Sequence, residues 1–116
     1  MSDAAEIVVD ADGHVLEPAD TWEKYIDPGY RDRAIRIARD EDGLERLLFD
    51  NKPMAFLRGN LGGLGGIDLE KGKLGQQTEE YTYADGSPPG GYDPAARLEV
   101  LDAEGIDRAI LYPTIG

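Results

Sequence analysis

The stretch IVVDADGHVLEP, residues 7–18, joins an apolar run to the only histidine of the chain. Its β-branched start, without polar alternation, predicts a strand over 7–10 that is buried in a parallel sheet. Because residues i and i+2 of an extended chain point to the same side, Asp12 and His14 are expected to converge. Gly13 between them lets the backbone bend or be approached closely. A carboxylate and an imidazole placed in this way can bind one divalent metal ion. The alternative is a strand-end loop in which both side chains make only turn hydrogen bonds.

The last part of the chain predicts a helix followed by another strand. Asp93 as N-cap, a proline directly after it and Gly105 as the C-terminal glycine predict a helix over 94–104. The apolar run that follows predicts a second buried strand over 107–112. Strand, helix and strand in this order form a βαβ unit, in which the two strands are parallel.

The connection between the two strands is expected to be a decorated crossover. A short helix is predicted over 21–26, with Asp20 as N-cap and Glu23 completing a capping box. Alternating apolar and charged residues around an acidic turn predict a β-hairpin over 34–49, which we interpret as a surface insertion. Two glycine-rich clusters predict a loop over 59–91, which would contact a substrate or partner or simply be mobile.

Charge and composition narrow the classes of partner and compartment. The chain has 12 basic and 24 acidic residues, a net charge of −12, which opposes binding to nucleic acids and to anionic membranes. It has no cysteine, so disulfides and thiolate metal sites are excluded. The acidic N-terminus lacks a long apolar run, so neither a signal peptide nor a membrane anchor is expected. These features predict a cytoplasmic protein.

Residue spacing excludes three other kinds of site. An EF-hand loop that began at Val8 would need glutamate where Ala19 stands. A Walker loop needs serine or threonine after its Gly-Lys pair, but Leu74 follows the Gly-Lys pair here. The chain also lacks a Gly-x-Ser-x-Gly elbow, so a Ser–His–Asp triad is not expected.

Two separate stretches resemble the amidohydrolase superfamily. VDADGHVLEP (9–18) with WEKY (22–25) resembles the N-terminal motif of its amidohydrolase 2 group, related to aminocarboxymuconate-semialdehyde decarboxylase and gamma-resorcylate decarboxylase. The segments DPAARL, LDAEGID and AILYPT, within 93–114, resemble the part of that family that follows. The resemblance covers 7–30 and 92–116 well, and the predicted hairpin and glycine-rich loop poorly.

The resemblance implies an α/β fold, the N-terminal portion of a metal-dependent (β/α)₈ TIM barrel with a hairpin insertion after its first strand. The first strand of such proteins ends in a His-x-His or acid-x-His metal pair, which here is Asp12 and His14. Zinc is the expected metal, and the carboxylate at position 12 also admits manganese or magnesium. Glu17 belongs to the same motif and is expected to lie behind the metal ligands or to contact the substrate. The alternative is a loop carboxylate that accepts hydrogen bonds from backbone N–H groups before Pro18.

The implied activity is that of a metal-dependent hydrolase or a non-oxidative decarboxylase (a lyase) acting on a small carboxylate or amide substrate. A complete barrel takes about 250 residues, and its later strands supply further metal ligands. We therefore expect residues 1–116 to be an inactive N-terminal fragment of a parent enzyme, which could be a homo-oligomer. The other hypothesis is a free-standing acidic α/β interaction module without catalysis, which should stop naturally here and melt cooperatively.

Overall fold

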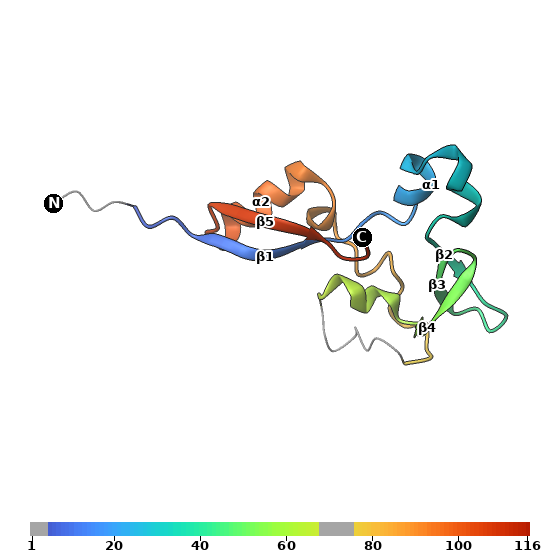
Figure 1. The fold of residues 1–116 in the computed structure, drawn as a ribbon. Coiled ribbons are helices and arrows are strands. Elements are labelled where there is room, and N and C mark those ends of the chain that lie inside the picture. The colour runs from blue at the N-terminus through green and yellow to red at the C-terminus, as the bar shows by residue number, and fades with distance from the viewer. Residues whose placement is uncertain (1–4, 68–75) are drawn as a thin grey trace. The chain divides into compact units, whose positions relative to one another are not determined.

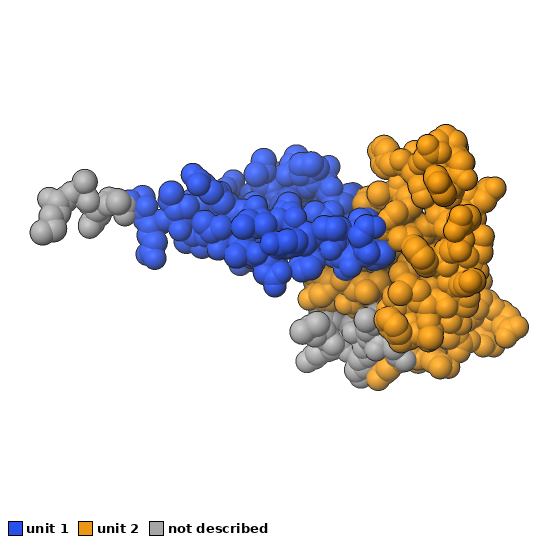
Figure 2. All heavy atoms as spheres, viewed as in Figure 1, with its two compact units in different colours: residues 1–17, 89–116 blue, residues 18–88 orange. Residues whose placement is uncertain are grey.

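The computed structural model describes residues 5–67 and 76–116, which form a mixed α/β fold with two small sheets. The elements are β1 (Val9–Val15), α1 (Thr21–Tyr25), η1 (Pro28–Arg33), β2 (Arg36–Arg39), β3 (Glu45–Phe49), β4 (Lys52–Arg58), η2 (Leu61–Gly65), η3 (Pro89–Gly91), α2 (Pro94–Glu104) and β5 (Arg108–Pro113), where η denotes a 3₁₀ helix. They divide into two compact units, residues 1–17 with 89–116 and residues 18–88 (Figure 2). No helix in these described ranges is long and apolar enough to cross a membrane.

The first unit contains β1 and β5, which lie side by side as a parallel pair joined through α2 (Figure 1). The helix predicted over 94–104 is confirmed as α2, together with both of its caps. The Asp93 carboxylate accepts the N–H of Ala96 at 2.8 Å, and Gly105 ends the helix in the left-handed conformation (φ 71°). The predicted βαβ order and parallel pairing are thus present.

The prediction that both strands are buried is wrong. Val9 at the start of β1 is 50% exposed, and Ile110 and Tyr112 of β5 are 49% and 48% exposed. The first strand also begins later than the predicted 7–10 and continues to Val15. Burial of a parallel strand requires cover on both faces. In the described residues β1 and β5 pair only with each other, and no residue of α2 is buried.

β1 carries a bulge next to its acidic residues. The pairing advances three residues on β1, from Asp10 to Gly13, while it advances two on β5, from Ala109 to Leu111. One carboxylate oxygen of Asp10 accepts the N–H of Asp12 at 3.0 Å, which holds the irregular backbone. A Cβ atom on Gly13 would lie 2.8 Å from the Leu111 side chain. The expected close approach at Gly13 is therefore present, and its partner is the neighbouring strand.

The second unit is built on a three-stranded antiparallel sheet in the order β2-β3-β4. Its first two strands form the predicted hairpin. The third strand, β4, was not predicted from the sequence, and Pro53 near its start weakens the strand pattern. Asp50 and Asn51 join β3 to β4 with positive φ angles of 51° and 62°, which are typical of a two-residue type I′ turn.

In the described part of the predicted loop over 59–91, the backbone is irregular apart from the short 3₁₀ helices η2 and η3, but several of its residues are buried, so this part packs as a fixed segment. Asn60 and Leu61 are 1% and 0% exposed, and Tyr83 is 3% exposed. A Cβ on Gly86 would lie 2.1 Å from the carbonyl oxygen of Gly62, so glycine allows two backbones to touch there. These glycines serve packing, whereas the part of the predicted loop over 68–75 lies outside the described residues.

The capping box predicted for the first short helix is also wrong. The Asp20 side chain makes no capping hydrogen bond to α1. Its carboxylate instead pairs with the Lys24 ammonium, one helical turn later, at 2.6 Å. The hydrogen bond from Lys24 lowers the pKa of Asp20, and a charged donor at i+4 thus replaces the backbone N–H that a cap would use.

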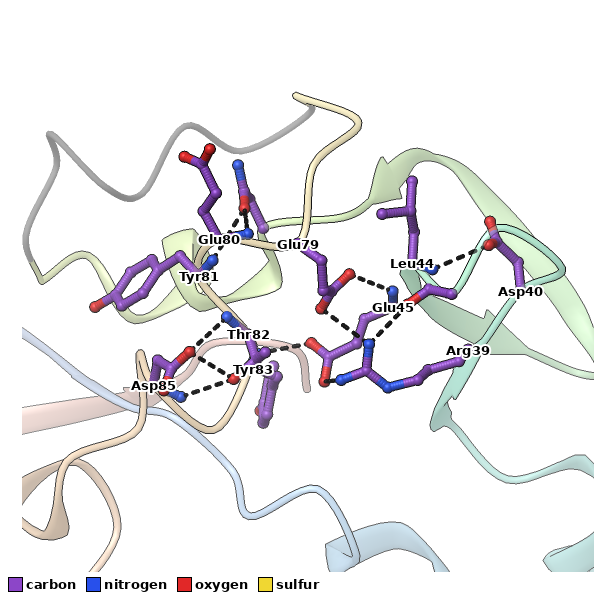
Figure 3. Close-up of polar contacts among 12 residues, drawn as sticks. Arg39, Asp40, Leu44, Glu45, Glu79, Glu80, Tyr81, Thr82, Tyr83 and Asp85 are labelled. Carbon is purple, nitrogen blue, oxygen red and sulfur yellow. Dashed lines mark hydrogen bonds and ion pairs between the residues drawn. The ribbon is translucent and has the colours of Figure 1, made fainter.

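A polar network ties the segment after residue 76 to the hairpin of the second unit (Figure 3). The Glu79 carboxylate accepts the N–H of Glu45 at 2.8 Å, and the Glu45 carboxylate accepts the N–H of Tyr83 at 2.7 Å. The Arg39 guanidinium lies 3.8 Å and 3.5 Å from the carboxylates of Glu45 and Glu79. Burial raises the pKa of Glu45, against the opposing effect of the Tyr83 N–H.

Candidate metal site

The two predicted metal ligands lie in the second half of β1, toward its carboxyl end. Asp12 and His14 stand on either side of Gly13, and His14 is in register with Tyr112 of β5. In parallel α/β proteins, ligands bind at the carboxyl ends of the strands. The described pair of strands therefore presents both residues where a ligand site of this fold class would lie.

Asp12 and His14 approach each other closely. The Oδ1 atom of Asp12 lies 3.4 Å from Nε2 of His14. The two side chains are 87% and 53% exposed, so both can be reached by an ion from solvent. Two ligands of a tetrahedral zinc ion, each about 2.0–2.2 Å from the metal, are themselves about 3.4 Å apart. The donor types and their separation thus fit a shared divalent ion.

The pair alone does not form a complete coordination shell. No group of three or more histidine, cysteine, aspartate or glutamate side chains in residues 5–67 and 76–116 is arranged to hold a metal. A catalytic zinc site normally has three protein ligands and a water molecule. With Asp12 and His14 as its only protein donors, a metal ion would be held weakly and would keep several waters.

Tyr112 is a neighbour of this pair that sequence reasoning missed. Its ring centroid lies 6.2 Å from that of His14, with the ring planes at 45°. Tilted ring pairs at such distances are attractive. The predicted parallel pairing indicated which strand lies beside His14, but the bulge in β1 sets the register and could not be deduced from the sequence.

Glu17 lies just after β1, and its side chain contacts the end of the chain. The residue is only 9% exposed. Its carboxylate accepts the N–H of Ile115 at 3.2 Å and the N–H of Gly116 at 3.0 Å. Charge-assisted bonds of this kind are stronger than neutral ones. Glu17 therefore fixes the segment that follows β5, and its expected position behind the ligands or at the substrate stays a prediction.

A second residue that sequence reasoning missed approaches His14 from α2. The Arg97 guanidinium donates to the backbone carbonyl of His14, with Nη2 and O separated by 2.6 Å. It also lies 3.4 Å from the carbonyl of Gly91. The two residues of the first contact are 83 positions apart in sequence, so no local pattern could have paired them.

No model of a known protein family matches this chain, and no curated protein matches it significantly.

Proposed function

We propose that this chain is the N-terminal part of a metal-dependent hydrolase or decarboxylase of the amidohydrolase type, in which Asp12 and His14 are two of the metal ligands. The observation that carries the proposal is the 3.4 Å approach of carboxylate and imidazole near the carboxyl end of a parallel strand. The two sequence stretches that resemble this family supply the same strand, helix and strand.

The residues of this chain would hold and orient the ion. The Asp12 carboxylate supplies a hard, anionic oxygen and His14 a borderline nitrogen, a combination that suits zinc and also manganese. The bound ion would activate a water molecule or polarise the carboxylate or amide of a small substrate. Asp12 also brings negative charge to the ion, which balances part of the metal's charge and favours retention of the cation.

The exposed apolar side chains of the first unit support the proposal that further strand–helix units belong to the enzyme. Leu98 on α2 is 62% exposed, and Leu111 on β5 is 42% exposed. In a (β/α)₈ barrel, such strands pair on both edges and are covered by helices and by the barrel interior. The remaining metal ligands would come from those units, which would also select the substrate.

The metal assignment can be tested on this chain because it contains one histidine. The imidazole NMR signals of His14 are uniquely assigned because the chain has one histidine. Mn²⁺ titrated into the protein should broaden these signals at low occupancy, since a paramagnetic ion acts on nuclei close to it. Asp12→Ala should raise the Mn²⁺ concentration needed for the same broadening. The matched control is Asp102→Asn, which removes one charge from an exposed position on α2.

The control separates a local site from general attraction of cations to an acidic chain. If Asp102→Asn reduced the broadening as much as Asp12→Ala, charge alone would explain the binding and the assignment would fail. The assignment would also fail if Mn²⁺ left the His14 signals sharp while broadening signals elsewhere in the chain.

A further inference from the structure

The backbone carbonyl of His14 faces away from β5. The next carbonyl, that of Val15, accepts the N–H of Thr114 at 3.1 Å and therefore points toward β5. Successive carbonyls of a strand point to opposite sides. The carbonyl of His14 thus lies on the outer edge of β1, where β5 cannot satisfy it.

Two contacts from the segment around α2 close this outer edge. Arg97 donates to the carbonyl of His14 at 2.6 Å, and the carbonyl of Gly91 accepts the N–H of Leu16 at 3.1 Å. The same guanidinium nitrogen of Arg97 lies 3.4 Å from the Gly91 carbonyl and so links the two contacts. The backbone on both sides of Val15 is held from outside the ladder.

These contacts hold the backbone of β1 at a point where its hydrogen bonds to β5 are irregular. The bulge between Asp10 and Gly13 interrupts the ladder immediately before His14. The direction of a side chain follows from the backbone angles of its own residue. A bond to the carbonyl of His14 restricts the peptide that follows it, and with it the direction of the imidazole toward Asp12 and Tyr112.

We propose that Arg97 is a positioning residue of the Asp12–His14 site, which orients the imidazole by holding the backbone carbonyl of His14. The part of this proposal that concerns a metal rests on the proposed function, whereas the orientation of the ring can be measured without metal. Arginine suits the task because its planar guanidinium presents several donors in a fixed geometry and stays charged.

The test compares Arg97→Met with Asp93→Ala in this 116-residue chain. Arg97→Met keeps a long apolar stem and removes every donor. Asp93→Ala removes the bond to the Ala96 N–H that caps α2, so it weakens the same helix and leaves Arg97 in place. Arg97→Lys is the second variant: it keeps the positive charge that Arg97→Met removes and provides the same comparison if Arg97→Met does not fold, but it replaces the planar fork with a flexible ammonium.

The first readout is the nuclear Overhauser effect between the His14 and Tyr112 rings in metal-free protein. It should weaken in Arg97→Met and, to a smaller extent, in Arg97→Lys, and should persist in Asp93→Ala. The second readout is the Mn²⁺ concentration that broadens the His14 signals, which should rise about tenfold in Arg97→Met, as for other groups that orient metal ligands.

The outcomes separate this proposal from the proposed function. A ring contact that weakens equally in Asp93→Ala, or that persists in both Arg97 variants, would overturn the positioning role whatever the metal does. If wild-type His14 showed no broadening while Arg97→Met still lost the ring contact, Arg97 would remain a positioning residue and the metal assignment alone would fail.

Discussion

Gly86→Ala should destabilise the second unit strongly, because Gly86 is packed against backbone. A Cβ atom at this position would lie 2.1 Å from the carbonyl oxygen of Gly62 and 2.6 Å from its Cα. Neither atom can rotate away as the end of a side chain could, so a backbone segment has to move. Overpacking of well-packed sites costs typically 1–3 kcal/mol, and contact with backbone places this substitution at about 3 kcal/mol.

If Gly86 lay in a mobile glycine-rich loop, Gly86→Ala would change the free energy of unfolding in the opposite direction. In a segment whose native backbone accepts alanine, Gly→Ala stabilises a protein by about 0.4–1 kcal/mol, because it restricts the unfolded chain. The substitution therefore discriminates between a packed and a mobile segment by the direction of its effect as well as by its size.

Urea unfolding followed through the fluorescence of Trp22 provides the assay, because this single tryptophan lies in the second unit. Gly29→Ala is the matched control, since the nearest atom to its Cβ would be a side-chain oxygen of Asp27 at 3.2 Å. We expect the free energy of unfolding to fall in Gly86→Ala and to change little in Gly29→Ala. Equal or greater stability of Gly86→Ala would refute the packing described for this segment.

Two further predictions concern titratable groups of the second unit. Burial raises the pKa of Glu45, so its contribution to stability is present below the ordinary 4.5 and is lost as pH rises through the raised value. Glu45→Gln keeps an acceptor for the Tyr83 N–H and should abolish this loss of stability in urea titrations across pH. Glu45→Ala leaves the N–H without this acceptor and should lower the free energy of unfolding by about 1–3 kcal/mol. A wild-type pH profile in Glu45→Gln would contradict the prediction. Arg58 donates to Asp40 at 2.7 Å and lowers the pKa of Asp40, so that contribution is present above the ordinary 3.8 and is lost as pH falls through the lowered value. In the same urea titrations across pH, Arg58→Met should lack the loss of the free energy of unfolding that the wild type shows at low pH. An unchanged loss at low pH in Arg58→Met would argue against a contribution from the Asp40–Arg58 pair.

Features that depend on neighbours in sequence could be predicted, and α2 is the clearest case. Its start depends on Asp93 and the N–H of Ala96, three residues later, and its end on the left-handed Gly105. The approach of Asp12 and His14 is equally local, because two residues separated by one position in a strand face the same way. Such contacts are determined within a few residues and can be deduced from the sequence.

Features that depend on distant partners could not be predicted. The contact between Gly62 and Gly86 joins positions far apart in sequence. A glycine-rich sequence occurs both in mobile loops and in segments where two backbones pack closely, so the sequence does not distinguish them. The neighbours of His14 depend on the register between β1 and β5, which the bulge shifts by one residue. A shift of one residue turns the side chains of a strand to the other face of the sheet, so Tyr112 could not be placed beside His14 beforehand. Arg97 could not be placed either, because its bond to the His14 carbonyl joins residues 83 positions apart.

The strands of the first unit show why a wrong prediction of burial still informs the function. The apolar runs over 7–9 and 109–112, which lie in or next to β1 and β5, are typical of strands covered on both faces, yet Val9 and Ile110 are about half exposed. Exposed apolar surface of this extent marks a site of contact with other protein or a liability to aggregation. A two-stranded sheet is also only marginally stable without such cover. The disagreement between apolar composition and exposure therefore supports the proposal that further strand–helix units complete the sheet. The same units would supply the metal ligands that are needed in addition to Asp12 and His14.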